Sequence, residues 1–216
     1  MEYANKYPDI IKPIIQLENQ YSKGIYSTYL NSNTYIILND LTDEVWLVDI
    51  GDVDKVIAEL QPNQTIKGVF FTHSHIDHIY GINELVSMYP NCKIYISIEG
   101  RESLFNDKRN FSFYYDTPLN FKGGDIQVIK NRTSINIFNE ISMKCIYTPG
   151  HDVSCMCYIC DKYIFTGDSY IPKVKPVTNL KGVDQHKCDL SLKIIQGYVQ
   201  NGLVVCPGHG PIFDSL

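Results

Sequence analysis

The chain has 216 residues and a net charge of −5, and hydrophobic residues make up 44% of it. This length can bury one substantial core, so we expect a single domain over residues 1–216. The charge supplies no basic stripe for nucleic acid, and no apolar run is long enough to span a membrane. The first nine residues lack a signal-peptide pattern and the seven cysteines are an odd number, which together predict a cytoplasmic protein.

The chain mixes helical and extended patterns, starting with a helix predicted over residues 53–60. Residues 67–72 then form a short apolar run rich in β-formers, which predicts a buried strand. Directly after this strand, residues 73–78 read His-Ser-His-Ile-Asp-His. Four residues of ligand type within six positions make this the most specific motif in the chain.

The spacing of this motif suits metal binding. Alternate residues of an extended chain point the same way, so His73 and His75 can face one ion. Asp77 and His78 stand where the chain turns toward a helix predicted around residues 81–89, and they aim at a neighbouring position.

Three later segments repeat the arrangement of an apolar strand that ends at a residue of ligand type. The strands are predicted over residues 142–147, 163–166 and 203–206, and they lead to His151, Asp168 and His209. A helix predicted over residues 190–200 completes a mixed α and β protein. Imidazole and carboxylate suit Zn²⁺ and related ions, and seven such groups can hold two metals.

This pattern resembles the metallo-β-lactamase superfamily, most closely its glyoxalase II-like hydrolases, from the strand before His73 to His209. The resemblance implies an α+β fold, a four-layer αββα sandwich with the metals at one edge between the two sheets. It also implies two Zn²⁺ ions per chain, with iron or manganese as alternatives. By position, the first metal would be bound by His73, His75 and His151, the second by Asp77, His78 and His209, with Asp168 bridging them.

Two metals in one site would lower the pKa of a bridging water toward about 7, so a hydroxide is available at neutral pH. We therefore expect a dinuclear zinc metallohydrolase that cleaves an ester-like bond, a thioester or lactone, in a small molecule. Asp77 is the expected catalytic residue, because its carboxylate can ligate a metal and orient the attacking water. Asp152 and backbone carbonyls are candidates to hold the imidazole N–H groups.

The substrate and the metal leave alternatives open. The chain stops seven residues after His209, without the C-terminal extension that holds glutathione in glyoxalase II proper. A β-lactam or phosphodiester hydrolase is one alternative, and an oxidoreductase of the persulfide dioxygenase type, with a single iron, is another. A non-catalytic binding module is a third alternative, although such a module would be expected to lose ligands. The sequence does not define an oligomeric state.

Three other features could carry function. Cys155, Cys157 and Cys160 could form a second metal site, but a β-hairpin over residues 154–166 would place Cys160 on the opposite face, so we expect structural cysteines. His186 lies in a polar stretch and is expected to be solvated. The aromatic-rich residues 101–121 could form a lid over the metals or pack on the sheet, and the sequence leaves both open.

Overall fold

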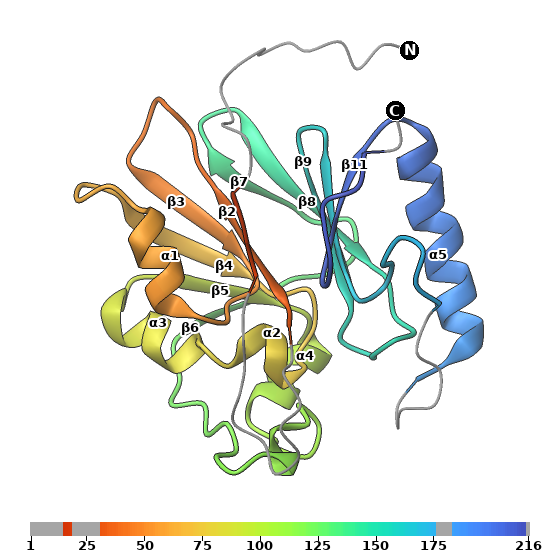
Figure 1. The fold of residues 1–216 in the computed structure, drawn as a ribbon, viewed down its shortest axis with the longest axis horizontal. Coiled ribbons are helices and arrows are strands. Elements are labelled where there is room, and N and C mark those ends of the chain that lie inside the picture. The colour runs from red at the N-terminus through yellow and green to blue at the C-terminus, as the bar shows by residue number, and fades with distance from the viewer. Residues whose placement is uncertain (1–14, 19–30, 176–182, 215–216) are drawn as a thin grey trace.

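The computed structural model describes residues 15–18, 31–175 and 183–214, and it shows two β-sheets packed face to face with helices on both outer sides (Figure 1). The expected four-layer αββα sandwich is confirmed. In the part of the chain that the structure describes, no helix is long and apolar enough to cross a membrane.

The first sheet has six strands in chain order. They are β1 (Ile15–Glu18), β2 (Asn33–Ile37), β3 (Glu44–Val48), β4 (Thr65–Phe70), β5 (Lys93–Ile96) and β6 (Asp125–Val128). Strands β1 to β3 pair antiparallel, and β3 to β6 pair parallel. The parallel strands require crossover connections, and these contain α1 (Val53–Glu59), α2 (Ile76–Ile79), α3 (Ile82–Met88) and α4 (Ile98–Leu104).

The second sheet has five strands. In spatial order they are β11 (Val204–Pro207), β10 (Tyr163–Gly167), β9 (Met156–Cys160), β8 (Ile141–Tyr147) and β7 (Ser134–Phe138). Helix α5 (Gln185–Gln200) covers its outer face, where Ile195 packs with Ile164 and Val205. A short 3₁₀ helix, η1 (Ser112–Tyr114), lies in the connection between α4 and β6.

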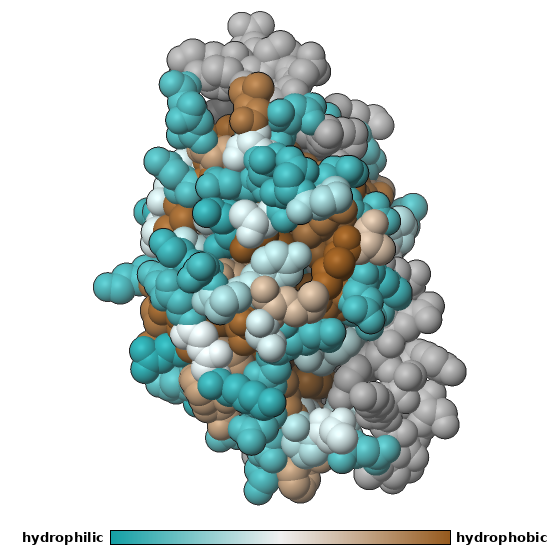
Figure 2. All heavy atoms as spheres, turned by 90° about the vertical axis from the view of Figure 1, so that its left-hand side faces the viewer, coloured by the Kyte–Doolittle hydropathy of each residue, from teal (hydrophilic) through white to brown (hydrophobic). Residues whose placement is uncertain are grey.

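Side chains alternate between the two faces of each strand, as the period of two in a β-strand requires. On β3, Trp46 and Val48 enter the core between the sheets, while Val45 and Leu47 enter the core beneath the helices. Both faces of the strand are therefore buried, which explains its continuous apolar run. Figure 2 views the α1 and α3 side, where polar side chains surround smaller apolar patches.

The predicted elements are found with small shifts at their ends. Helix α5 begins five residues earlier than predicted, because the Asp184 side chain accepts a hydrogen bond from the Lys187 backbone N–H (3.1 Å) and caps it. The hairpin is confirmed as β9 and β10, which pair antiparallel. Cys157 faces α5 and Cys160 faces the core between the sheets, so these two cysteines point apart as expected.

Gly68 marks the closest approach of the β4 backbone to the aromatic side chains between the sheets. A methyl group at this position would lie 2.6 Å from Cζ3 of Trp46 and 3.1 Å from Cε2 of Tyr95. Gly197 in α5 has open space around the same position. A glycine is thus required sterically in the strand and is dispensable in the helix.

We predict opposite effects of adding this methyl group at the two glycines. Gly68→Ala should lower the free energy of unfolding by about 1–3 kcal/mol, because the Trp46 ring must move. Gly197→Ala should raise it by about 0.5–1 kcal/mol, because alanine loses less backbone entropy in a helix. Urea unfolding of the metal-free proteins, followed by fluorescence of the single tryptophan, measures both. A Gly68→Ala protein as stable as the wild type would contradict this packing.

Candidate metal centre

The seven His and Asp residues singled out in the sequence lie together at one edge of the two sheets, on the loops that follow β4, β8, β10 and β11 and on helix α2. Their atoms form three overlapping groups, each with ligand-type atoms within 4.8 Å of one another. His73, His75 and His151 form what we call the first group, and Asp77, His78 and His209 form the second group; His73, His78 and Asp168 form a set that links these two groups. Side chains separated by up to 136 positions in the sequence thus share one small space.

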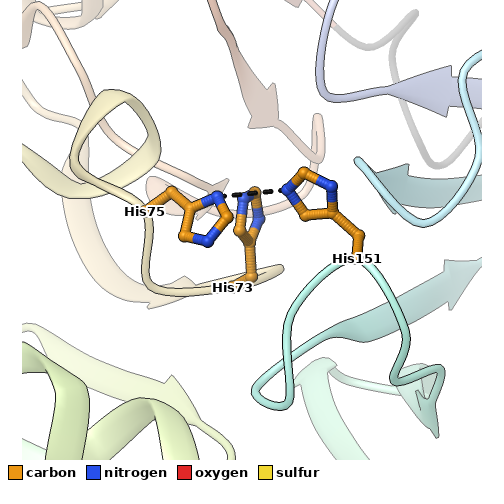
Figure 3. A group of neighbouring side chains, drawn as sticks. All are labelled: His73, His75 and His151. Carbon is orange, nitrogen blue, oxygen red and sulfur yellow. Dashed lines mark hydrogen bonds between the residues drawn. The ribbon is translucent and has the colours of Figure 1, made fainter. Parts of the chain in front are cut away.

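The first group consists of three buried imidazoles that point toward one another (Figure 3). His73 and His75 follow the end of β4, His75 in extended backbone, and His151 comes from the loop after β8. Nε2 of His151 lies 3.1 Å from Nδ1 of His75. A tetrahedral Zn²⁺ with bonds of about 2.0–2.1 Å separates neighbouring nitrogens by about 3.3 Å, so the spacing fits one shared ion.

The second group joins the short helix α2 to the loop after β11. Helix α2 presents Asp77 and His78 on successive positions, and Oδ2 of Asp77 lies 3.5 Å from Nε2 of His78. Nε2 of His209 is 3.4 Å from the same carboxylate oxygen. The Nδ1–H of His209 donates to the backbone carbonyl of Asn31, which leaves its Nε2 facing the cluster.

Asp168 lies between the two groups. Its Oδ1 is 3.5 Å from Nε2 of His78, and its Oδ2 is 3.6 Å from Nε2 of His151 and 3.3 Å from Nε2 of His209. Burial would raise the pKa of this carboxyl, but the His78 and His209 imidazoles hold it well below its usual value. A carboxylate in this position can bind two cations at once.

The close approach to Asp168 depends on Gly208. A Cβ atom there would lie 2.2 Å from Oδ1 of Asp168 and 2.8 Å from Cε1 of His78. The residue before His209 therefore has to be glycine. The glycine of the Pro-Gly-His segment is needed for this close packing as well as for the turn.

Buried polar atoms without hydrogen-bond partners test whether the cluster fits a central cation. Among the described residues, Nε2 of His73, Nε2 of His78 and Oδ1 of Asp168 are buried and have no hydrogen-bond partner. Such atoms are costly in a folded protein. A cation at the centre would satisfy all three, so the donor set fits divalent metal ions.

The surroundings shift the pKa values of the clustered imidazoles in different directions. Burial, together with the neighbouring His78 and His75, lowers the pKa of His73 well below its usual value. Its imidazole is neutral at pH 7 and keeps a lone pair for a ligand bond. Burial also lowers the pKa of His151. For His78 burial acts in the same direction, but the carboxylates of Asp77, Asp168 and Asp49 outweigh it and raise the pKa well above normal.

Asp49 is a site residue that the sequence analysis did not identify. It follows β3, has a positive φ of 58°, and is 1% exposed. Its carboxylate accepts hydrogen bonds from the Thr72 backbone N–H (2.8 Å) and hydroxyl (2.7 Å), and from Nδ1 of His78 (2.8 Å). An aspartate after an apolar strand is the same signal that identified Asp168, but no strand is predicted before Asp49 from the sequence.

Asp49 controls which imidazole nitrogen faces the cluster. Because the Thr72 hydroxyl donates to Asp49, it accepts from Nδ1–H of His73, 3.1 Å away. Asp49 itself accepts from Nδ1–H of His78. Both imidazoles therefore hold a proton on Nδ1, so in their neutral form Nε2 is unprotonated and faces the cluster.

Asp152, the candidate from the sequence to hold an imidazole N–H group, instead supports the loop that carries His151. Its carboxylate accepts hydrogen bonds from the Ser154 backbone N–H (2.8 Å) and hydroxyl. The Ser154 hydroxyl in turn lies 3.2 Å from that of Ser74, between His73 and His75. Asp152 approaches Nε2 of His75 only to 3.7 Å, which exceeds hydrogen-bond distance.

The remaining candidates lie outside the cluster. No cysteine takes part in the three groups found among the described residues, and Cys155, Cys157 and Cys160 are buried as free thiols. His186 is exposed in the first turn of α5. A hollow of about 730 Å³, lined by α1, α3 and residues 117–122, includes none of the seven residues. A smaller cleft of about 80 Å³ is lined by His151 and Asp168.

Comparison with solved structures shows the same fold. The B3 metallo-β-lactamase BLEG-1 is 23% identical, with 92% of this chain and 94% of that chain covered and a TM-score of 0.75. TTHA1623 in a di-iron-bound form is 20% identical, covering 90% and 93%, with a TM-score of 0.69. ETHE1 from Myxococcus xanthus is 19% identical, covering 93% and 79%, with a TM-score of 0.63. At these identities the likeness is one of fold.

The family model described as the metallo-beta-lactamase superfamily matches residues 27–212, which include all seven His and Asp residues of the cluster. This match covers most of the sequence and agrees with the sandwich and the cluster at its edge. The chain therefore belongs to the metallo-β-lactamase superfamily.

Proposed function

We propose that this protein is a glyoxalase II-like dinuclear zinc hydrolase that cleaves an ester-like bond, a thioester or lactone, in a small molecule. The observation that carries the proposal is the position of Asp168 between two groups of ligand-type atoms. His73, His75 and His151 would hold one ion, Asp77, His78 and His209 the other, and Asp168 both. When bound, two divalent ions supply a water of lowered pKa and polarise a carbonyl.

The chain's own residues would position the reactants. Asp77 is largely buried at the cluster, where its carboxylate can accept a hydrogen bond from the attacking water and orient it toward the carbonyl carbon. No side-chain nucleophile is required. Burial raises the pKa of Cys157 to about 12, so its thiol stays protonated and unreactive at neutral pH.

A cleft adjoins the cluster. It has a volume of about 80 Å³ and is bordered by His151 and Asp168. Its remaining lining is mostly apolar and is formed by Ser169, Tyr170, Ile171, Val174, Lys175 and Leu192. Chromogenic thioester, lactone, β-lactam and phosphodiester substrates, assayed with the metal-reconstituted protein, test the reaction class directly. Hydrolysis confined to the β-lactam or phosphodiester would overturn the proposed bond type.

Metal content is the first prediction of this proposal. The protein reconstituted with excess Zn²⁺ and then desalted should hold close to two ions per chain by elemental analysis. Protein purified without added metal shows which ions it acquires in the cell. One ion or fewer after reconstitution would exclude the dinuclear site, and a single iron with oxygen consumption on a persulfide would identify the oxidoreductase alternative instead.

Substitution of the carboxylates gives the second prediction. Asp77→Asn should lower kcat/KM for any accepted substrate by about 10²–10⁴-fold, because the amide keeps the shape but loses the charge that orients water. Asp168→Asn should be at least as damaging, because that carboxylate contacts both groups. Cys157→Ser is the matched control: it should change stability while kcat/KM at full metal occupancy stays near wild type. The reverse ordering would refute these roles.

The third prediction concerns the proton position on His78. Asp49→Asn replaces one accepting oxygen of the carboxylate with an NH₂ group, which donates. In one orientation of the amide this group faces the Thr72 backbone N–H, and in the other it faces Nδ1–H of His78. We expect a loss of metal affinity of about 10–100-fold, measured by competition with a chelator. Asp189→Asn, an exposed change on α5, serves as the control. Unchanged affinity in Asp49→Asn would show that Asp49 does not control the tautomer.

A further inference from the structure

Aromatic side chains border the cluster on the side of His75. The Phe111 ring lies 4.6 Å from the His75 ring, centroid to centroid, at an angle of 43°. Tyr114 follows at 6.2 Å from Phe111, and Phe113 lies 5.8 Å from Tyr114. We refer to Phe111, Phe113 and Tyr114 as the aromatic wall. Phe113 and Tyr114 are 51% and 64% exposed, so the wall continues from a buried imidazole to the surface.

Phe111 adopts a backbone conformation that a bulky residue rarely takes. Its φ and ψ are 62° and 6°, in the left-handed region. The preceding Asn110, which is fully buried, enforces this turn. Its side chain accepts a hydrogen bond from the Ser112 backbone N–H (2.9 Å) and donates one to the Ser103 carbonyl in α4 (3.1 Å). A strained backbone conformation persists where several surrounding contacts hold it in place. Such conformations are frequent at functional sites.

The wall is also attached to the loop that carries the ligands. The Asn110 carbonyl accepts a hydrogen bond from the backbone N–H of Ile76, 2.9 Å away. Ile76 stands between His75 and Asp77, so one backbone contact sets the position of Phe111 relative to both groups. The ring is therefore positioned before any substrate arrives, which is the arrangement that gives binding at low entropic cost.

We propose that the aromatic wall is a substrate-binding surface for an aryl or similarly flat apolar substituent next to the scissile carbonyl. This inference rests on the proposed function, because it places the reacting bond at the cluster. Packing of Phe111 against the edge of the site puts its ring within reach of a group attached to that bond. Exposed aromatic rings next to a cluster of polar residues offer an apolar contact surface of this kind.

A pair of thiols tests the wall by binding alone. Ethanethiol and benzyl mercaptan carry the same ligating group and differ in the ring, and cobalt-substituted protein reports thiolate binding by its visible spectrum. Wild-type protein should bind benzyl mercaptan about tenfold more tightly than ethanethiol, as expected for partial burial of one ring. Phe111→Asn, which tolerates the left-handed backbone but lacks the ring, should abolish that preference and leave the Kd of ethanethiol unchanged.

Two further variants control for a structural effect. Phe111→Tyr keeps the ring and should keep the preference. Phe105→Ala removes an aromatic side chain that is 60% exposed and packs on Phe121, away from the cluster, and should also keep it. If Phe111→Asn weakened the binding of both thiols equally, Phe111 would only support the position of His75, and the proposal would be overturned.

The outcomes separate this inference from the proposed function. If the protein binds cobalt and hydrolyses its substrate but shows no preference for the aryl thiol, the binding role of the aromatic wall is refuted. The proposed hydrolase function then still stands. Absence of cobalt binding would refute both. In the kinetic version, kcat/KM for a phenylacetyl thioester, relative to its acetyl counterpart, should fall about tenfold in Phe111→Asn.

Discussion

One buried carboxylate, Asp49, holds the ligands of this site in a state that can bind metal. It accepts directly from His78 and, through the Thr72 hydroxyl, governs His73. Neutral imidazole can carry its proton on either nitrogen, and only one tautomer leaves Nε2 free. Burial raises the pKa of Asp49, while His78 and Thr72 oppose that effect by hydrogen bonding to its charged form. The two groups of ligands are thus coupled by a residue that belongs to neither.

The sandwich explains why such a coupling is possible. Asp49 follows β3 and Thr72 follows β4, and these strands are parallel neighbours, so their carboxyl ends meet at one sheet edge. The second sheet brings β8, β10 and β11 to the same edge with His151, Asp168 and His209. Packing of large side chains such as Trp46 and Phe165 between the sheets fixes the distance between the two halves of the cluster.

The sequence was sufficient for the residues that lie in a dense motif or follow a predicted strand. The His-x-His-x-Asp-His motif and the strand-end pattern identified all seven clustered residues, because ligand type and strand period are both local properties. Asp49 was missed because its partners, Thr72 and His78, are 23 and 29 positions away. The position of Phe111 against His75 could not be predicted either, since it depends on the buried side chain of Asn110.

The ligand atoms alone do not select a reaction. Imidazole and carboxylate serve zinc, iron and manganese, and the similar structures include both a B3 metallo-β-lactamase and a protein in a di-iron-bound form. In this chain β9 keeps its cysteines buried and protonated, so soft thiolate ligands do not compete for the site. Selectivity must then come from groups that touch the substrate without touching the metal. The aromatic wall is built for that role: its orientation is set by a strained backbone and by a hydrogen bond to Ile76, independently of what the ligands hold.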